Sequence, residues 1–156
     1  MSSSSASQPQ IRQIGAEETG VILECARRYC SVIPWVQFNE EHYFKAWYQI
    51  LASGEGAVFA LEADGRCLGG VGGTVVKLPL TGKIAALEMF WYVLPEYRGS
   101  GGVRLLKRFE DWAREQGCEE IEMVLLECSM ADKLDRFYQR SGYAPTERHY
   151  RKELVA

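Results

Sequence analysis

The segment that decides the fold reads Val93-Leu94-Pro95-Glu96-Tyr97-Arg98-Gly99-Ser100-Gly101-Gly102-Val103-Arg104. Pro95 ends an apolar run because proline cannot donate to a β-ladder, and an amphipathic helix begins after the glycines. Glycines between a strand and a helix let the backbone approach a ligand closely, and the N–H groups and dipole of a helix N-terminus favour a phosphate. The segment therefore predicts either a pyrophosphate site or a tight glycine turn with nothing bound.

Before this segment, the sequence predicts one strand, two helices and a three-stranded meander. Residues 11–14 are typical of a short strand, and apolar residues at helical spacing predict a helix over residues 17–29. Asn39 can cap a second helix that runs through about Leu51. The Asp64-Gly65 turn and its β-rich flanks favour antiparallel pairing. The three strands are expected over residues 57–63, 67–77 and 84–94.

After this segment, the sequence predicts alternating helices and strands. A helix is expected over residues 99–116, and Gly117 stops it. Residues 119–127 alternate as a strand does, residues 131–140 have helical spacing, and residues 142–152 are expected to form a last strand. The predicted order is βααβββαβαβ. The apolar face of the first of these helices consists of Leu105, Leu106, Phe109, Trp112 and Ala113.

The composition describes one globular domain. The chain has 156 residues, 47% hydrophobic and 12% aromatic, with a net charge of −3, whereas disordered chains are poor in aromatic residues and strongly charged. The mild acidity argues against nucleic acid as a partner, because phosphate contacts need a clustered positive surface, and it suits an amine substrate. Residues 1–10 lack signal-peptide features and are expected to form a disordered tail before a single domain over residues 11–156. No apolar run approaches the roughly 20 residues that cross a bilayer, so we expect a cytoplasmic protein without a membrane partner.

The cysteines and histidines give no sign of a metal site or a hydrolytic triad. The five cysteines contain no C-x-x-C pair, so neither a zinc cage nor a disulfide framework is indicated, and most are expected to be small buried hydrophobes. His42 and His149 are isolated, with no serine or cysteine at motif spacing. The cysteines are Cys25, Cys30, Cys67, Cys118 and Cys128.

Two motifs in order resemble the GNAT superfamily of acetyltransferases. The first, V-x-P-E-Y-R-G-x-G, is similar to the superfamily's acetyl-CoA motif of Arg or Gln, two residues, Gly, one residue, then Gly or Ala. Arg98 and Gly101 match this pattern, whereas Val103 occupies the last position, with Gly102 beside it. The second motif, residues 137–143, is similar to the superfamily's Y-x-x-x-G-[FY] segment.

The resemblance covers residues 84–151 by motif and the N-terminal half by element order, and it departs where Ala131 replaces a frequent Asn. It implies an α/β (α+β) fold, GNAT-like, with a mixed, mostly antiparallel central sheet and helices on both faces. It also implies transfer of the acetyl group of acetyl-CoA, as cosubstrate, to a primary amine by direct attack through a ternary complex. The cofactor-binding residues would be Tyr92, Val93, Leu94, Arg98, Gly99, Ser100, Gly101, Gly102, Val103 and Arg104.

The implied chemistry needs an oxyanion donor, an acid and a base. A backbone N–H near Tyr92 or Val93 would stabilise the oxyanion, and Tyr138 would protonate the departing sulfur. Glu88 is the candidate base, with Glu127 as its rival. The acceptor is expected to be a small-molecule or peptide amine, and a homodimer is compatible with the sequence.

Each of these residues also has a structural interpretation. Tyr138 lies on an apolar stripe and could belong to a core, and Glu88, between Leu87 and Met89, also fits a solvent-facing side chain. The glycines at residues 69–73 favour a β-bulge or a close approach over a phosphate loop, because the Lys-Ser/Thr of such a loop is missing. Four aromatic residues near the first interhelical connection could wall an acceptor pocket or pack under the sheet: Trp35, Phe38, Tyr43 and Trp47.

Two other classes of protein remain open at this point. One is a nucleotide-binding βαβ module, since Gly99 and Gly101 follow a strand and open a helix, although Arg104 replaces the third glycine of that fingerprint. The other is a non-catalytic acyl-CoA binder that has kept the fold.

Overall fold

The computed structural model describes residues 7–155. The tail expected over residues 1–10 falls partly outside this range, and Gln10 already belongs to the first strand. The chain divides into two compact units after Val124, which are described separately below. The expectation of a single domain over residues 11–156 stays a prediction.

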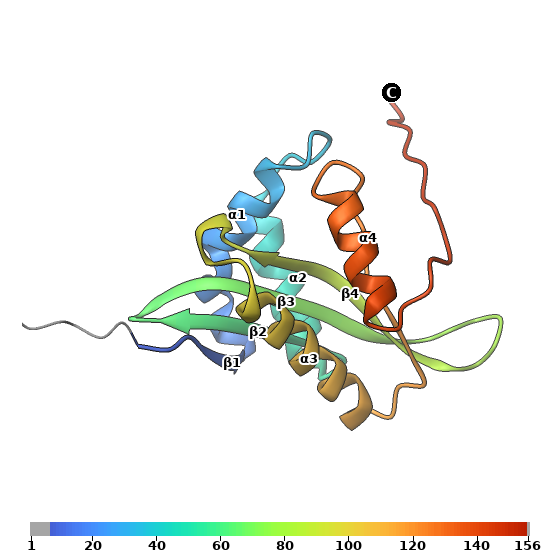
Figure 1. Cartoon of the computed structure of the whole chain (residues 1–156), viewed down its shortest axis with the longest axis horizontal. Coiled ribbons are helices and arrows are strands. Elements are labelled where there is room, and N and C mark those ends of the chain that lie inside the picture. The colour runs from blue at the N-terminus through green and yellow to red at the C-terminus, as the bar shows by residue number, and fades with distance from the viewer. Residues whose placement is uncertain (1–6, 156) are drawn as a thin grey trace, which may run out of the picture. The chain divides into compact units, whose positions relative to one another are not determined.

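The first unit is built on one five-stranded sheet, of which Figure 1 labels β1, β2, β3 and β4. The first four strands pair antiparallel in sequence order, and the fifth joins the fourth in parallel. The predicted turn between the second and third strands is confirmed, because Asp64 and Gly65 both have positive φ, at 50° and 74°. The strands are β1 (Gln10–Ile14), β2 (Gly56–Ala63), β3 (Arg66–Lys77), β4 (Ile84–Val93) and β5 (Glu120–Glu122).

The helices follow the predicted positions with one change of type. The first predicted helix begins as a 3₁₀ segment, η1 (Ala16–Ile22), before α1 (Leu23–Ser31), because Thr19 and Gly20 are poor α-helix formers. The predicted cap of α2 is confirmed by a 2.9 Å hydrogen bond from the N–H of His42 to Oδ1 of Asn39. The remaining helices are α2 (Glu40–Ser53), the short η2 (Pro95–Tyr97), α3 (Ser100–Glu115) and α4 (Ala131–Arg140).

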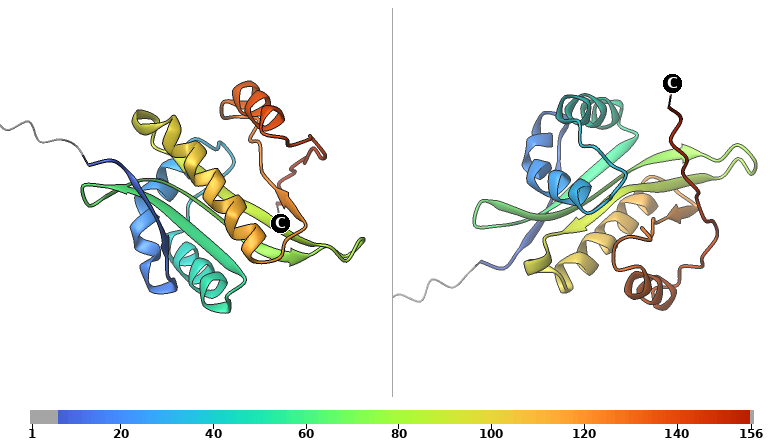
Figure 2. Two further views of the ribbon diagram at one scale, coloured as in Figure 1. Left: turned by 60° about the horizontal axis from the view of Figure 1, so that its bottom comes forward. Right: turned by 90° about the horizontal axis from the view of Figure 1, so that it is seen from above.

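The sheet is buried on both faces. Figure 2 shows α1 and α2 on one face and α3 on the other. Val58 and Ala60 of β2 belong to the apolar cluster under α1 and α2, and the intervening Phe59 belongs to the cluster under α3. This is the alternation expected of a strand, and it confirms the predicted mixed sheet with helices on both faces.

A β-bulge interrupts β4 opposite the glycines of β3. Gly72 pairs with Phe90 and Gly73 with Glu88, so Met89 has no partner in β3. The extra residue shifts the alternation, and Ala86 and Val93 therefore share the cluster under α3 although they are an odd number of residues apart. The irregularity predicted for residues 69–73 is confirmed.

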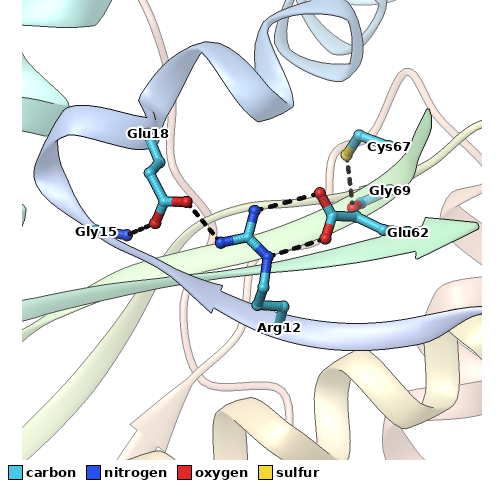
Figure 3. A network of polar contacts seen from close by, with 6 residues as sticks. All are labelled: Arg12, Gly15, Glu18, Glu62, Cys67 and Gly69. Atoms are coloured by element: carbon cyan, nitrogen blue, oxygen red, sulfur yellow. Dashed lines mark hydrogen bonds and ion pairs between the residues drawn. The ribbon is translucent and has the colours of Figure 1, made fainter. Parts of the chain in front are cut away.

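A polar network fixes β1 at the edge of the sheet (Figure 3). The Arg12 guanidinium lies 2.7 Å from a Glu18 oxygen and 3.0 Å from a Glu62 oxygen. Glu18 also accepts a 2.8 Å hydrogen bond from the N–H of Gly15. Exposed ion pairs contribute only about 0–1 kcal/mol each, so we assign this network to the register of β1 rather than to stability.

The last predicted strand is absent from the described part of the chain. No strand follows α4, and β5 has three residues where residues 119–127 were expected. Pro145 lacks an N–H for a ladder, and the charged residues around His149 leave no apolar face to bury. The prediction of a strand over residues 142–152 is therefore wrong. Within residues 7–155, no helix is both long and apolar enough to cross a membrane.

Candidate functional site

The β4–β5 ladder is short, and Glu88 lies where it ends. Ala85, Ala86 and Leu87 pair with Glu120, Ile121 and Glu122, and the register stops there. Just beyond the paired residues, the N–H of Val124 donates to Oε2 of Glu88 over 2.8 Å. A carboxylate thus takes the place of a backbone acceptor where the two strands separate.

The Glu88 side chain is buried, with 6% of the residue exposed. The solvent-facing interpretation is wrong, because the bulge at Met89 changes which side chains of β4 are covered. Burial raises the pKa of Glu88 to about 7, against a smaller lowering by the N–H of Val124. A carboxyl group with a pKa near neutrality can accept a proton at physiological pH, as a general base must.

The rival base, Glu127, is in the second unit, residues 125–156. Its side chain is 69% exposed, and Oε1 lies 3.7 Å from Nε of Arg148. This carboxylate is exposed, whereas that of Glu88 is buried where two strands separate, so the geometry favours Glu88 as the candidate base.

The N–H of Val93 points to the edge of β4 opposite β3, beyond the last residue that pairs with β5. The N–H of Leu94 donates to the carbonyl of Leu68 in β3 over 2.9 Å. Successive residues of a strand direct their polar groups to opposite edges, so the N–H of Tyr92 faces β3 and that of Val93 faces away. Of the two predicted oxyanion donors, only Val93 has the required direction.

The turn after β4 is attached to its neighbours by side chains. Nε of Arg98 donates to the carbonyl of Val93 over 3.0 Å, and the guanidinium lies 5.5 Å from the centre of the Tyr92 ring. Tyr92 meets Tyr29 of α1 edge-on, at 5.8 Å between ring centres. Arg98, predicted to bind the cofactor, therefore also closes the turn that precedes α3.

The N-terminus of α3 has the backbone geometry of an anion site. Gly99 has a φ of 132°, which L side chains rarely adopt, and its carbonyl accepts from the N–H groups of Gly102 and Val103. Ser100 and Gly101 precede the first intrahelical bonds, so their N–H groups point out of the helix end. The dipole of α3 favours negative charge there.

Two other residues predicted to bind the cofactor, Gly101 and Arg104, have structural roles in this segment. A Cβ at Gly101 would lie 2.7 Å from Cδ2 of Leu61, so glycine at this position lets α3 pack close to β2. The Arg104 guanidinium donates to the carbonyl of Pro9 over 2.9 Å and holds the chain before β1. Val103, which departs from the motif, is 48% exposed.

In the second unit, the sequence motif around Tyr138 is a helix C-terminus. Gly142 has a φ of 89°, and the N–H of Tyr143 donates to the carbonyl of Tyr138 over 2.9 Å. The Tyr138 ring lies 5.5 Å from that of Tyr143 and 6.1 Å from that of Phe137. Glycine at the left-handed position explains the spacing of this motif.

The aromatic residues near the α1–α2 connection separate into two groups. Tyr43 donates from its hydroxyl to the carbonyl of Thr19 over 2.8 Å, and Trp47 meets Phe90 edge-on at 5.4 Å. These two belong to the core, which confirms the packing interpretation for them. Trp35 is 44% exposed and stays a candidate wall of an acceptor pocket.

Sequence reasoning missed the partners that shape the site. The N–H of Val124 was not foreseen, and the bulge predicted from the glycines of residues 69–73 was not connected with the burial of Glu88. The contact of Tyr29 with Tyr92 had no signal in the sequence.

The fold and the strand–turn–helix segment are those expected of an acyltransferase, and residues 18–143 match the acetyltransferase (GNAT) family. The chain belongs to this family. The class expected from the two sequence motifs is therefore confirmed.

Three similar proteins illustrate the range of the family. Aminoglycoside N(6′)-acetyltransferase type 1 of Stenotrophomonas maltophilia is 38% identical over 78 residues, which are 47% of this chain and 51% of that protein. The match thus spans about half the length of this relative. The structure of aminoglycoside N-acetyltransferase AAC(6′)-Iy with the bisubstrate analogue CoA-S-monomethyl-acetylneamine has a TM-score of 0.72 at 22% identity, over 95% of this chain and 100% of that one. A protein of Clostridium acetobutylicum described as a predicted acetyltransferase, in its structure with acetyl-CoA, has a TM-score of 0.76 at 14% identity, over 94% and 96% of the two chains.

Proposed function

We propose that this protein transfers the acetyl group of acetyl-CoA to a primary amine of an aminoglycoside by direct attack. The observation that carries the proposal is the buried Glu88 carboxyl, with its pKa raised to about 7, at the point where β4 and β5 separate. Membership of the acetyltransferase (GNAT) family supports the reaction.

The reaction needs a base, an oxyanion donor and an acid, and each has a candidate group. Glu88 takes a proton from the ammonium of the acceptor, and the freed amine forms a bond to the acetyl carbon. The N–H of Val93 stabilises the oxyanion that develops. The carbon–sulfur bond then breaks, and Tyr138 gives its phenolic proton to the CoA thiolate. The acceptor nitrogen loses its second proton as the amide forms, which balances the proton that Tyr138 gives up. The N-terminus of α3 at Gly99 and Ser100 holds the cofactor's pyrophosphate.

The acceptor is proposed from the relatives and from charge. One relative is described as an aminoglycoside N(6′)-acetyltransferase, and aminoglycosides are polycations at neutral pH. A protein with a net charge of −3 suits such a substrate better than an anionic one. Exposed Trp35 offers an apolar surface for a sugar ring. A peptide amine is the alternative acceptor.

Binding of the cofactor can be tested without knowing the acceptor. Acetyl-CoA at about 100 times its Kd should raise the Tm by roughly 5–10 °C, because a ligand selective for the folded state stabilises it. A nicotinamide dinucleotide should leave the Tm unchanged. The absence of a shift with acetyl-CoA would contradict the proposal, and a shift with the dinucleotide alone would favour the nucleotide-binding module.

The acceptor is tested by following thiol release from acetyl-CoA with paired aminoglycosides that carry either an amino or a hydroxyl group at position 6′. We expect thiol release only with the 6′-amino compound. Acetyl-CoA binding without release for any amine, peptides included, would instead identify a non-catalytic acyl-CoA binder. Release with both compounds would exclude the 6′ position.

The role of Tyr138 predicts a split between turnover and binding. Tyr138→Phe keeps the ring that packs against Tyr143 but removes the acidic hydroxyl. The kcat should fall by about 100-fold or more, with little change in acetyl-CoA affinity. Steady-state kinetics and a thermal-shift titration measure the two quantities, and an unchanged kcat would reduce Tyr138 to a packing residue.

A further inference from the structure

Two buried cysteines from different elements of the first unit lie side by side. Cys25 of α1 and Cys67 of β3 have their sulfur atoms 3.8 Å apart, although the residues are 42 positions apart in the chain. They are 1% and 8% exposed, respectively. Neither residue belongs to the acetyl-transfer site proposed above.

The two thiols are held facing each other. Sγ of Cys67 donates to the carbonyl of Gly69 over 3.3 Å, a contact drawn in Figure 3, and Sγ of Cys25 lies 3.9 Å from the carbonyl of Cys67. Leu68 is the extra residue of a bulge in the β2–β3 ladder, since Glu62 pairs with Cys67 and Leu61 with Gly69. The bulge turns Cys67 toward α1.

We propose that Cys25 and Cys67 are a dithiol that hydroperoxides oxidise to a disulfide, which joins α1 covalently to β3. A disulfide has an S–S length of about 2.05 Å, so the sulfurs need to approach by about 1.7 Å. α1 is a helix of nine residues on the surface of the sheet, and a rotation of two side chains with a small shift of such a helix supplies this displacement.

The chemistry begins at Cys67, the more exposed of the two residues. A hydrogen bond from the Cys25 thiol lowers the pKa of Cys67, and the same contact, together with burial, raises the pKa of Cys25. The thiolate is the nucleophile in thiol chemistry, so Cys67 is the residue that attacks.

Both steps balance with hydrogen peroxide as the oxidant. The Cys67 thiolate attacks one peroxide oxygen, an S–O bond forms, the O–O bond breaks, and the leaving oxygen takes a proton to become water. The sulfur of Cys25 then attacks the resulting sulfenic acid, an S–S bond forms, and the hydroxyl leaves with the Cys25 proton as a second water. The dithiol loses two electrons, and hydrogen peroxide gains them.

The experiment maps the bond on the full chain. After treatment with hydrogen peroxide and alkylation of free thiols, trypsin separates Cys25 in peptide 13–27 from Cys67 in peptide 67–77 and Cys30 in peptide 29–45. We expect peptides 13–27 and 67–77 to be joined before reduction, about 2 Da lighter than their sum. Recovery of alkylated Cys67, of its sulfinic acid, or of a bond to Cys30 would overturn the proposal.

Thermal unfolding gives a second readout. The oxidised chain should have a Tm higher by roughly 5 °C, because the cross-link restricts the unfolded state. Cys25→Ala should abolish the shift, and Cys118→Ala, which alters a cysteine in another part of the first unit, should keep it. If Cys25→Ala does not fold, the peptide map of the wild-type chain still decides. A shift that persists in Cys25→Ala contradicts the proposal.

Discussion

Glu88→Gln is expected to lower kcat/KM at pH 7 by roughly 100-fold to 10,000-fold, the range attributed to a general base. Glutamine keeps an oxygen that can accept the 2.8 Å hydrogen bond from the N–H of Val124, but it cannot take a proton from the ammonium of the acceptor. The measurement is the steady-state rate of thiol release with acetyl-CoA and the active amine.

The pH dependence of kcat/KM also tests the role of Glu88 as the base. Only ionised Glu88 can act as the base, and its pKa is raised to about 7. In the wild type, kcat/KM should therefore fall about tenfold for each pH unit below 7. The variant should lack this decline. A variant that retains the decline with a similar midpoint would remove Glu88 from the mechanism.

The thermal stability of Glu88→Gln distinguishes the loss of the base from damage to the fold. The native pKa of Glu88 lies above the ordinary value of 4.5, so the folded state binds the proton more tightly than the unfolded state. The tighter proton binding of Glu88 contributes roughly 3 kcal/mol to the free energy of unfolding. This contribution is complete below pH 4.5 and is lost as the pH rises to about 7. Glutamine does not titrate. At pH 8, the variant should therefore be at least as stable as the wild type, and a lower Tm would mean that unfolding explains any loss of activity.

Local signals in the sequence were sufficient for the turn after β4 and for the last helix. Pro95 and Gly99 act on their own backbone, the first by lacking an N–H and the second by adopting a positive φ of 132°. α4 has the predicted bounds of residues 131–140, because its apolar spacing and the Gly142 cap are both local. Such features do not depend on pairing with a strand that is distant in the sequence.

The burial of Glu88 and the absence of the last strand could not be predicted, because both depend on pairing between distant residues. The alternation of β4 predicts one face for Glu88 only if the strand is regular, and the bulge at Met89 is set against Gly72 and Gly73 of another strand. Residues 142–152 were assigned to a strand with no partner specified by the sequence. Register and pairing are properties of the sheet, not of one segment.

The glycine opposite Glu88 controls whether this geometry can form. Gly73 is the β3 partner of Glu88, and a Cβ at residue 73 would lie 2.1 Å from the carbonyl oxygen of Leu87 and 2.7 Å from Cζ of Phe109. The first contact is with backbone, which cannot move without shifting β4 itself. The second is with the fully buried ring that α3 packs on the sheet.

Gly73→Ala is therefore expected to destabilise the protein by about 3 kcal/mol or more, since overpacking against fixed atoms forces the backbone to move. The Tm should fall by roughly 6–12 °C. Because the displaced carbonyl belongs to the residue before Glu88, turnover should also fall at temperatures where the variant is still folded.

Gly102→Ala is the matched control for stability. A Cβ there would lie 3.7 Å from both Trp91 and Val93 side-chain atoms, an ordinary contact, and alanine favours a helix over glycine by about 1 kcal/mol. Its Tm should equal or exceed that of the wild type. If Gly73→Ala matched it, the close approach of β3 to β4 would not be required, and the bulge that buries Glu88 would need another cause.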